Sequence, residues 1–291
     1  MLQTINLSMR YPTKKLFENV NLTLDSGKRY GLIGANGAGK STFLKILSGA
    51  YEASSGEIVI APNTRLGVLG QDQYAFESLS LKDAVLIGNK RLYDAIKRKE
   101  YLYENADLSN EATNEELGEL EMVCAEEDPI YEYDVVIEKI LEDLGFPADK
   151  HNELMSTLTG GDKFKILLAQ VLFPKPDILL LDEPTSNLDL PSISWLEENL
   201  KRHEGTMVVI SHDRHFLNSV CTHILDMDFG SVREFSGNYD DWYIASTLIA
   251  KQQEAERNKK TQRKRGAGEL YPSLFCQCFQ SQASHESPKT A

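Results

Sequence analysis

The chain has 291 residues and a formal net charge of −13, which allows one large domain or two small ones and excludes binding to polyanions by bulk electrostatics. Its four cysteines form no CxxC pair, so they indicate a reducing compartment and exclude a disulfide framework. No apolar run approaches the roughly 18–20 residues that span a bilayer, and we therefore expect a globular cytoplasmic protein without membrane insertion.

The first motif in the chain is GLIGANGAGKSTFL, which follows an apolar run at residues 30–33 and opens a helical pattern at residues 40–47. Glycines in such a loop let successive amide hydrogens point at a phosphate, and the helix adds its positive N-terminal end. In the pattern GxxxxGK[ST], Lys40 reaches the β and γ phosphates and Ser41 holds Mg²⁺. We expect these residues to surround the phosphates: Gly34, Asn36, Gly37, Ala38, Gly39, Lys40, Ser41 and Thr42.

A charge contrast marks the next segment. Residues 81–103 carry a helical pattern with basic clusters at residues 90–91 and 97–99, whereas residues 104–134 contain acids and neither lysine nor arginine. The segment is roughly 30 residues longer than two or three short helices need. An acidic, solvated helix pair explains the second half most simply, and an arm that docks on a partner is the alternative.

The stretch PDILLLDEPTSNLD gives an apolar run at residues 178–181, followed by Asp182 and Glu183. Such a run is typical of a buried parallel strand, and ligands bind at the carboxyl ends of strands in doubly wound sheets. Two acids after a strand more often cap a helix. In a chain that already has Lys40 and Ser41, they suit a nucleotide site, with Asp182 on Mg²⁺ and Glu183 polarising an attacking water.

A second predicted core strand, residues 207–210, ends in Ser211 and His212. A lone histidine is usually structural. At the end of a core strand beside a phosphate site, His212 becomes a candidate contact for the γ-phosphate. We expect His215, on the following helix, to be a surface or packing residue.

Together these segments resemble an ATP-binding cassette. The stretch LTGGDKFKILLAQVLF is similar to the signature LSGGQ of that family, with Thr159 in place of serine and Asp162 in place of glutamine. The resemblance implies an α/β fold with a RecA-like P-loop core, an antiparallel β portion and a helical subdomain that carries an arm. It also implies ATP and Mg²⁺ as ligands. The signature residues Thr159, Gly160 and Gly161 are expected to close over the nucleotide of a second cassette, either a missing C-terminal half or another copy of the chain.

Three further site residues follow from the resemblance alone. Gln71 matches the Q-loop glutamine that senses Mg²⁺ and the attacking water, with Gln73 as a second candidate. Residues 186–189, reading SNLD, match the D-loop at the dimer interface, which places Asp189 near the nucleotide. Tyr11 occupies the position of the aromatic ring that stacks on adenine, although a tyrosine in a turn is as often a packing residue.

The arm, the phrase SHDRHFLNSVCTHILDMDFG and the stretch FSGNYDDWYIASTLIAKQQEAERNKKTQRK resemble the F subfamily, ABC-F, whose members join two cassettes and act on ribosomes. The resemblance implies an ATPase in translation, with the ribosome and transfer RNA as partners. Helix formers prevail from Asp241 to Lys264, and positive charge dominates residues 251–265, which suits a phosphate backbone. The alternatives are the ATPase subunit of a membrane transporter and an inactive truncated fragment.

We therefore predict three parts: a cassette at residues 1–236 with a helical and arm subdomain at about 76–160, a basic helical linker start at 237–265, and a tail at 266–291. Codons permitted for residues 273–287 also encode, one nucleotide later, a basic segment similar to the family's linker. We expect a disordered tail produced by a frameshift that truncates the chain. Cys276 and Cys278 lie in that tail and are taken as accidental neighbours.

Overall fold

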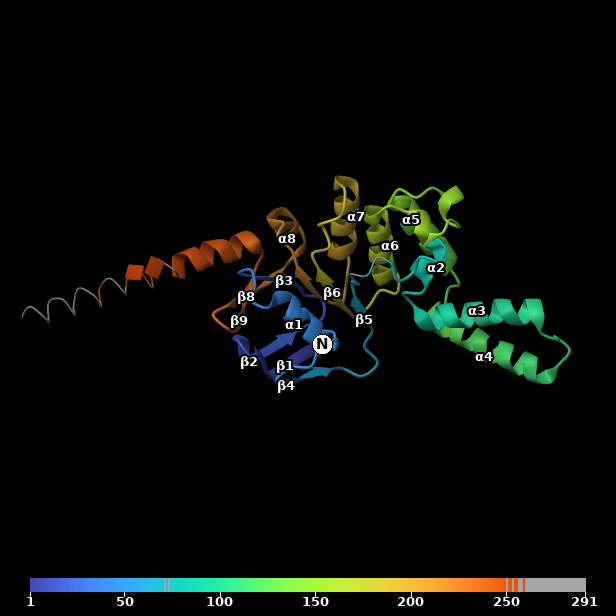
Figure 1. Ribbon diagram of the computed structural model, residues 1–291, viewed down its shortest axis with the longest axis horizontal. Helices are drawn as coiled ribbons and strands as arrows, with labels where there is room; N and C mark the ends of the chain where they lie inside the picture. Colours follow the sequence, from blue (N-terminus) through green and yellow to red (C-terminus); the bar gives the residue numbers. More distant parts are fainter. Residues whose placement is uncertain (71, 73, 250, 253, 256–258, 260–291) are drawn as a thin grey trace, which may run out of the picture. The chain divides into compact units, whose positions relative to one another are not determined.

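The structure is a computed structural model that describes residues 1–70, 72, 74–249, 251–252, 254–255 and 259 (Figure 1). The chain divides into a first unit, Met1–Tyr239, and a second unit, Asp240–Ala291, and each is described by itself. No helix in the described part of the chain is long and apolar enough to cross a membrane.

A six-stranded sheet forms the centre of the first unit. The strands are hydrogen-bonded in the order β5 (Leu66–Val68), β6 (Ile178–Asp182), β7 (Thr206–Ile210), β3 (Arg29–Gly34), β8 (His223–Asp228) and β9 (Ser231–Ser236). All neighbouring pairs are parallel except β8 and β9. Strand β7 is buried throughout and β6 up to its last residue, which explains their unbroken apolar sequences and confirms the predicted strands.

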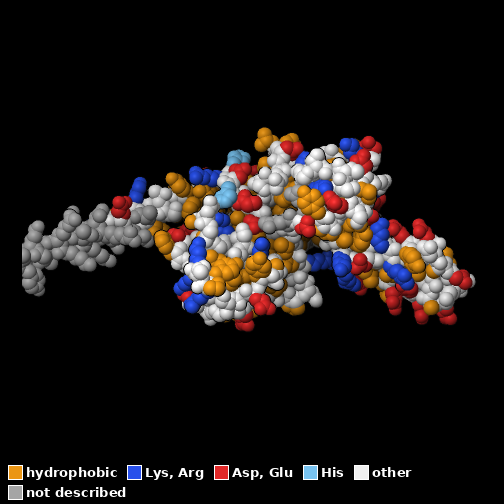
Figure 2. Space-filling model, in the orientation of Figure 1, with side chains coloured by type: hydrophobic (Ala, Val, Ile, Leu, Met, Phe, Trp, Pro, Cys, Tyr) orange, Lys and Arg blue, Asp and Glu red, His pale blue; other side chains and the backbone are white. Residues whose placement is uncertain are grey.

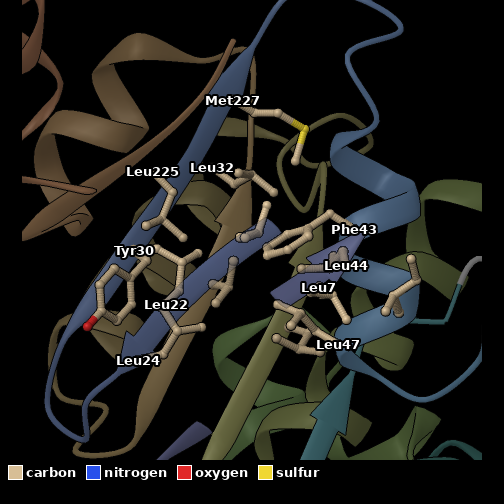
Figure 3. Close-up of a cluster of buried hydrophobic side chains, with 14 of the residues drawn as sticks. Leu7, Leu22, Leu24, Tyr30, Leu32, Phe43, Leu44, Leu47, Leu225 and Met227 are labelled. Carbon is tan, nitrogen blue, oxygen red and sulfur yellow. The ribbon is translucent and has the colours of Figure 1, made fainter. Parts of the chain in front are cut away.

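A second, antiparallel sheet near the N-terminus has the order β2 (Lys14–Leu24), β1 (Leu2–Tyr11) and β4 (Ser55–Ile60). It shares one hydrophobic core with the central sheet and with helix α1 (Lys40–Leu47), as Figure 3 shows for Leu7, Leu22, Leu32 and Phe43. The rings of Phe17 and Phe43 meet edge to face with their centroids 5.3 Å apart. This packing fixes α1 and the loop before it, and it confirms the predicted antiparallel portion.

The remaining helices of the first unit form two groups. Helices α6 (Gly160–Leu172), α7 (Leu190–Lys201) and α8 (Arg214–Val220) belong to the connections between the central strands. The other helices form the helical subdomain, and a second hydrophobic core joins this subdomain to α6. The elements not yet given are α2 (Leu81–Leu86), α3 (Lys90–Asn105), α4 (Glu111–Glu127), α5 (Tyr133–Asp143) and the 3₁₀ turns η1 (Ala148–Lys150) and η2 (Met155–Thr157).

The helical pattern predicted over residues 81–103 is interrupted in the structure, between α2 and α3. A Cβ atom on Gly88 would lie 2.0 Å from the carbonyl oxygen of Gln170, so only glycine fits where α2 packs on α6. Asn89 then caps α3 by accepting a hydrogen bond from the Leu92 amide at 3.3 Å. The interruption gives the hairpin of α3 and α4 its own direction, away from the rest of the first unit (Figure 1).

The basic and acidic halves of this segment pair with each other along the hairpin, which we call the arm (residues 90–127). Arg98 binds Glu116 at 2.7 Å, and Lys99 binds Glu121. Further acidic side chains lie around the tip of the arm (Figure 2). The second acidic half is therefore one helix, packed on a basic one, instead of the pair of acidic helices that seemed simplest.

In the second unit, the described residues from 240 to 249, together with 251–252, 254–255 and 259, are helical, as the run of helix formers from Asp241 predicts. The predicted tail at 266–291, with its frameshift, lies outside the described residues.

Candidate nucleotide-binding site

A pocket of about 350 Å³ opens at the carboxyl edge of the central sheet, where β3, β6 and β7 end side by side. We call it the phosphate pocket. The glycine loop forms one side, and the residues after β6 and β7 form the other. Its lining residues are Asn36, Gly37, Gly39, Lys40, Ser41, Thr42, Asp182, Glu183, Ile210 and His212. The structure thus brings together nearly all of the residues that the two motifs and the second strand predicted.

The glycine loop has the form needed to receive an anion. Gly39 precedes α1 with φ 109°, and a Cβ atom there would also lie 3.1 Å from the Leu16 side chain, so the turn requires glycine. No side chain among the described residues caps the first turn of α1, which leaves its amide hydrogens for a ligand. The Lys40 ammonium donates to the carbonyls of Gly34 at 2.9 Å and Ala35 at 3.3 Å, and it therefore lies folded over the loop.

Ser41 and Asp182 both line this pocket, Ser41 in the first turn of α1 and Asp182 at the end of β6. No group of three histidine, cysteine or acidic side chains among the described residues could hold a metal by itself. One hydroxyl and one carboxylate suit Mg²⁺, which usually keeps several waters and takes further oxygens from phosphates. The donor set therefore fits Mg²⁺ that arrives with a phosphorylated ligand.

Glu183 combines an unusual backbone conformation with a partly buried carboxylate. Its backbone adopts φ 51°, a region that non-glycine residues rarely enter. One carboxylate oxygen, Oε2, accepts a hydrogen bond from the His212 amide at 3.3 Å. The other, Oε1, is buried and lacks a hydrogen-bond partner among the described residues. Burial raises the pKa of this carboxyl, and the nearby His212 opposes the rise. Such strain and an unsatisfied oxygen are typical of a functional group.

Asp182 and Glu183, the two acids at the end of β6, do not cap the next helix. The N-cap residue of α7 is Asp189. Its Oδ1 accepts a hydrogen bond from the Ser192 amide at 3.0 Å, and its Oδ2 accepts one from Lys165 at 2.8 Å. These bonds lower the pKa of Asp189 to about 2. The carboxylate predicted to face a nucleotide is thus engaged within its own chain, and it does not line the phosphate pocket.

The signature residues also lie outside the phosphate pocket. Thr159 caps α6, where its hydroxyl donates to the Asp162 carboxylate at 2.8 Å and accepts from the Asp162 amide at 3.4 Å. Gly160 is exposed, and Gly161 lies beside the Asn187 carbonyl. Asp162 in place of glutamine therefore holds the hydroxyl that the resemblance assigns to a nucleotide.

Five other predicted residues have different outcomes. Tyr11 ends β1, is 43% exposed and does not line the phosphate pocket, and Gly34 supports the loop through its carbonyl. Gln71 and Gln73 lie outside the described residues. His215 is a surface residue, as predicted, with its Nδ1 3.8 Å from Oε1 of Glu197.

A neighbouring pocket of about 360 Å³, which we call the outer pocket, lies on the far side of the glycine loop. It shares Asn36 and Gly37 with the phosphate pocket, and it also contains Ala38. The β1–β2 hairpin and the β8–β9 turn complete it, and its lining residues are Lys14, Lys15, Leu16, Ala35, Asn36, Gly37, Ala38, Met227, Asp228, Phe229 and Gly230. The turn at residues 228–230 ends the phrase that resembles the F subfamily, but the sequence predicted no site there.

Fold and site define a P-loop nucleotide-binding protein. The ABC transporter family model matches residues 17–186, and the chain belongs to that family. It resembles the solved "Structure of ATP binding subunit of ABC transporter", with a TM-score of 0.63 at 19% identity over 85% of this chain and 99% of that one. The dimeric post-hydrolysis structure of the ATP-binding cassette MJ0796, bound to ADP and Pi, gives a TM-score of 0.56 at 20% identity, covering 81% of this chain and 98% of that one.

Longer relatives resemble the chain more closely in sequence. It is 47% identical over 263 residues to the uncharacterized ABC transporter ATP-binding protein YkpA of Bacillus subtilis, covering 90% of this chain and 48% of YkpA. Identity is 33% with the energy-dependent translational throttle protein EttA of Escherichia coli K12, over 87% of this chain and 46% of EttA. The chain is 31% identical to ABC transporter F family member 2 of Arabidopsis thaliana, over 98% of this chain and 43% of that protein. The chain spans about half the length of these relatives.

Proposed function

We propose that this chain is a cassette that hydrolyses ATP and acts on the ribosome in translation. The observation that carries the proposal is the phosphate pocket, because it gathers an anion-binding loop, Lys40, a Mg²⁺-compatible pair and a strained Glu183 with one buried oxygen. The name of EttA, a translational throttle protein, supports the ribosome as the place of action. A cytoplasmic location and transfer RNA as a contact of the linker remain predictions.

Each residue has a part that follows from its position. The loop amides and Lys40 hold the phosphates, and the Lys40 ammonium exchanges its two carbonyl partners for phosphate oxygens. Ser41 and Asp182 are the residues that would hold Mg²⁺, which supplies positive charge against the charge that develops on the transferred phosphoryl group. Oε1 of Glu183 orients the attacking water, and His212, 3.6 Å away, contacts the γ-phosphate side.

A second cassette is part of the proposal, because the signature residues of this chain do not line its own phosphate pocket. Thr159, at the N-terminus of α6, is exposed and can face a nucleotide held elsewhere. The dimeric MJ0796 structure supports pairing of cassettes. In this chain the partner is either a further cassette or another copy. Turnover per chain that rises with protein concentration supports pairing between copies.

The experiment that tests the proposed hydrolysis is Glu183→Gln in the whole chain. The variant should bind ATP with unchanged affinity and hydrolyse it about 100-fold more slowly, since general base catalysis contributes roughly that factor or more. His215→Gln is the matched control, because His215 is exposed and lies outside the pocket. Equal turnover in Glu183→Gln and the parent chain removes Glu183 from the mechanism.

The structural neighbours favour a second candidate, the ATPase subunit of a membrane transporter, since one of them is described as the ATP-binding subunit of an ABC transporter. The two candidates share the phosphate pocket, and they differ in partner. Sedimentation of the chain with ribosomes, and not with membranes, in the presence of ATP supports the translation proposal. The opposite result supports the transporter.

A further inference from the structure

A further pocket, of about 290 Å³, lies against the arm and shares no residue with the phosphate pocket. Helices α3 and α4 and the segment that leads from α4 into α5 form its walls (Figure 1). Three tyrosines line it, and we call it the tyrosine pocket. Its lining residues are Leu92, Ile96, Lys99, Glu100, Tyr103, Glu121, Cys124, Asp128, Tyr131 and Tyr133.

The tyrosine pocket joins a buried apolar floor to exposed rings. Leu92 and Cys124 are buried, whereas Tyr103 is 58% exposed and Tyr131 is 54% exposed. Burial raises the pKa of the Cys124 thiol, which therefore stays uncharged at pH 7. A small ligand with an apolar part can thus contact the rings in water and the floor beneath them.

Tyr131 is held at this pocket in an unusual conformation. Its backbone has φ 58°, in the left-handed region that non-glycine residues rarely enter. Its amide donates to the Asp128 carbonyl at 3.1 Å, and its hydroxyl donates to Oε1 of Glu121 on α4 at 3.1 Å. The ring is therefore anchored at both ends, on a strained backbone. Strain of this kind is concentrated at functional positions.

The rings of the tyrosine pocket also differ from the other tyrosines of α3 in what lies over them. The Lys97 ammonium lies 5.9 Å from the ring centroid of Tyr93, and the Arg98 guanidinium lies 5.3 Å from that of Tyr101. Within the described part of the chain, no basic group lies in this way over any of the three pocket tyrosines. Tyrosine rings attract cations, so these three are left for a cation from outside the chain.

The charges of the lining favour the same class of ligand. Three carboxylates contribute to the pocket, those of Glu100, Glu121 and Asp128, and the basic residue of the lining is Lys99. Glu121 binds the Lys99 ammonium, so this positive charge is already paired. The excess of carboxylates repels anions and attracts cations. A volume of about 290 Å³ is at the lower limit for ligand pockets, and the ligand should therefore be small.

We propose that the tyrosine pocket binds a small, weakly hydrated organic cation, of the quaternary ammonium or alkylguanidinium class. The carboxylates attract the cation, the rings contact its charged group, and the floor accepts its aliphatic part. This site is separate from the nucleotide site and does not depend on the proposed ATP binding. The same chemistry occurs in a free small molecule and in an arginine side chain of a protein, so the test includes a probe for each.

The test measures binding to the whole chain by titration calorimetry, with two pairs of probes. Choline is compared with its uncharged isostere 3,3-dimethylbutanol, and N-acetylargininamide with the uncharged N-acetylcitrullinamide. At least one cation should bind about tenfold more tightly than its uncharged counterpart, since a cation over several rings gains on this scale. Tighter binding of choline assigns the pocket to a free small molecule, and tighter binding of N-acetylargininamide assigns it to a protein side chain.

Substitutions then locate the binding site. Tyr103→Leu should weaken binding of the preferred cation about fivefold, because one ring is lost, and Tyr103→Phe should keep the affinity of the parent chain. Tyr103 is exposed, so the thermal midpoint should stay as in the parent chain. Glu100→Gln should weaken cation binding and reduce its dependence on salt. Tyr101→Leu is the matched control, since Tyr101 is an exposed tyrosine of the same helix outside the pocket, and its affinity should be unchanged.

Two results overturn the inference. If neither cation binds more tightly than its uncharged counterpart, the pocket does not recognise positive charge. If Tyr103→Leu binds the preferred cation as tightly as Tyr101→Leu does, the cation is held elsewhere on the chain.

Discussion

The carboxylate of Glu183 and the imidazole of His212 meet at the ends of neighbouring strands, with Oε1 and Nε2 3.6 Å apart. Pairing of β6 with β7 aligns Asp182 with Ile210, and the residues that follow each strand therefore arrive at the same side of the sheet. Twenty-nine positions apart in sequence, the two side chains form one unit, joined further by the His212 amide on Oε2. Within this unit, Oε1 of the carboxylate is buried, whereas the Glu183 side chain as a whole is 31% exposed.

Glu183→Gln should make the unliganded chain more stable at pH 7 and leave its stability unchanged at pH 4. Burial raises the pKa of Glu183 in the folded state above its ordinary value of 4.5, so ionisation costs more in the folded chain than in the unfolded one. This cost is absent below the unfolded pKa and complete once the pH exceeds the folded pKa. We expect the thermal midpoint to rise at pH 7. An equal shift at both pH values would contradict the explanation.

Lys40→Ala should weaken ATP binding about 100-fold while leaving the fold intact, because a charge-assisted contact to phosphate is lost and only two bonds to loop carbonyls disappear from the unliganded chain. Calorimetry and thermal unfolding measure the two effects. Lys45→Ala is the matched control, since Lys45 lies on the same helix, in contact with the Tyr51 ring, and does not line the phosphate pocket. Similar losses in both variants would show that charge near α1, instead of the Lys40 ammonium itself, attracts ATP.

Asp189→Ala should lower the free energy of unfolding by about 1 kcal/mol at pH 7, through loss of the N-cap of α7. The folded pKa of about 2 lies below the ordinary 3.8, so the carboxylate stabilises the fold above about pH 4. The difference between the variant and the parent should shrink as the pH falls from 4 to 2, as measured by urea unfolding. Asp189→Asn keeps a capping side chain and should cost less. A difference that does not change with pH would exclude the charge as the cause.

Glu127→Ala should loosen the base of the arm. The Glu127 side chain is 5% exposed and accepts hydrogen bonds from Arg65 at 2.8 Å, Arg91 at 3.0 Å and Asn89 at 3.0 Å. Its removal leaves these donors without their carboxylate, at a cost of about 2–3 kcal/mol. Hydrogen exchange should accelerate in the last turn of α4 and the first turn of α3.

The adjacent Glu126→Ala is a close control for this prediction. The Glu126 side chain is 65% exposed, and it pairs with Arg91 at 3.0 Å. Surface pairs of this kind contribute little to stability, so hydrogen exchange in the arm should stay as in the parent chain. Equal acceleration in the two variants would mean that charge near Arg91, and not the buried carboxylate, fixes the arm.

Much of the phosphate pocket could be predicted from the sequence, because its signals are local. The apolar run of residues 178–181 and the glycines before Lys40 each specify their own strand or loop. The edge of a parallel sheet then brings them together. The contact between Glu183 and His212 follows from the same rule, since each residue comes directly after a buried strand.

Other features depend on distant neighbours and could not be read locally. Gly88 interrupts the helical pattern because of the Gln170 carbonyl, which belongs to a helix far along the chain. The carboxylate of Asp189 looks available in the sequence, but Lys165 of α6 binds it in the fold. In each case the cause is a tertiary contact.

The bonds of Glu127 also have a mechanical consequence. This carboxylate joins the end of α4 to Asn89 and Arg91 at the beginning of α3, and to Arg65, the residue immediately before β5. The base of the arm is therefore attached, through Arg65, next to the edge strand of the central sheet. A displacement of the arm at its base therefore has to break or shift the bond between Glu127 and Arg65, which immediately precedes β5.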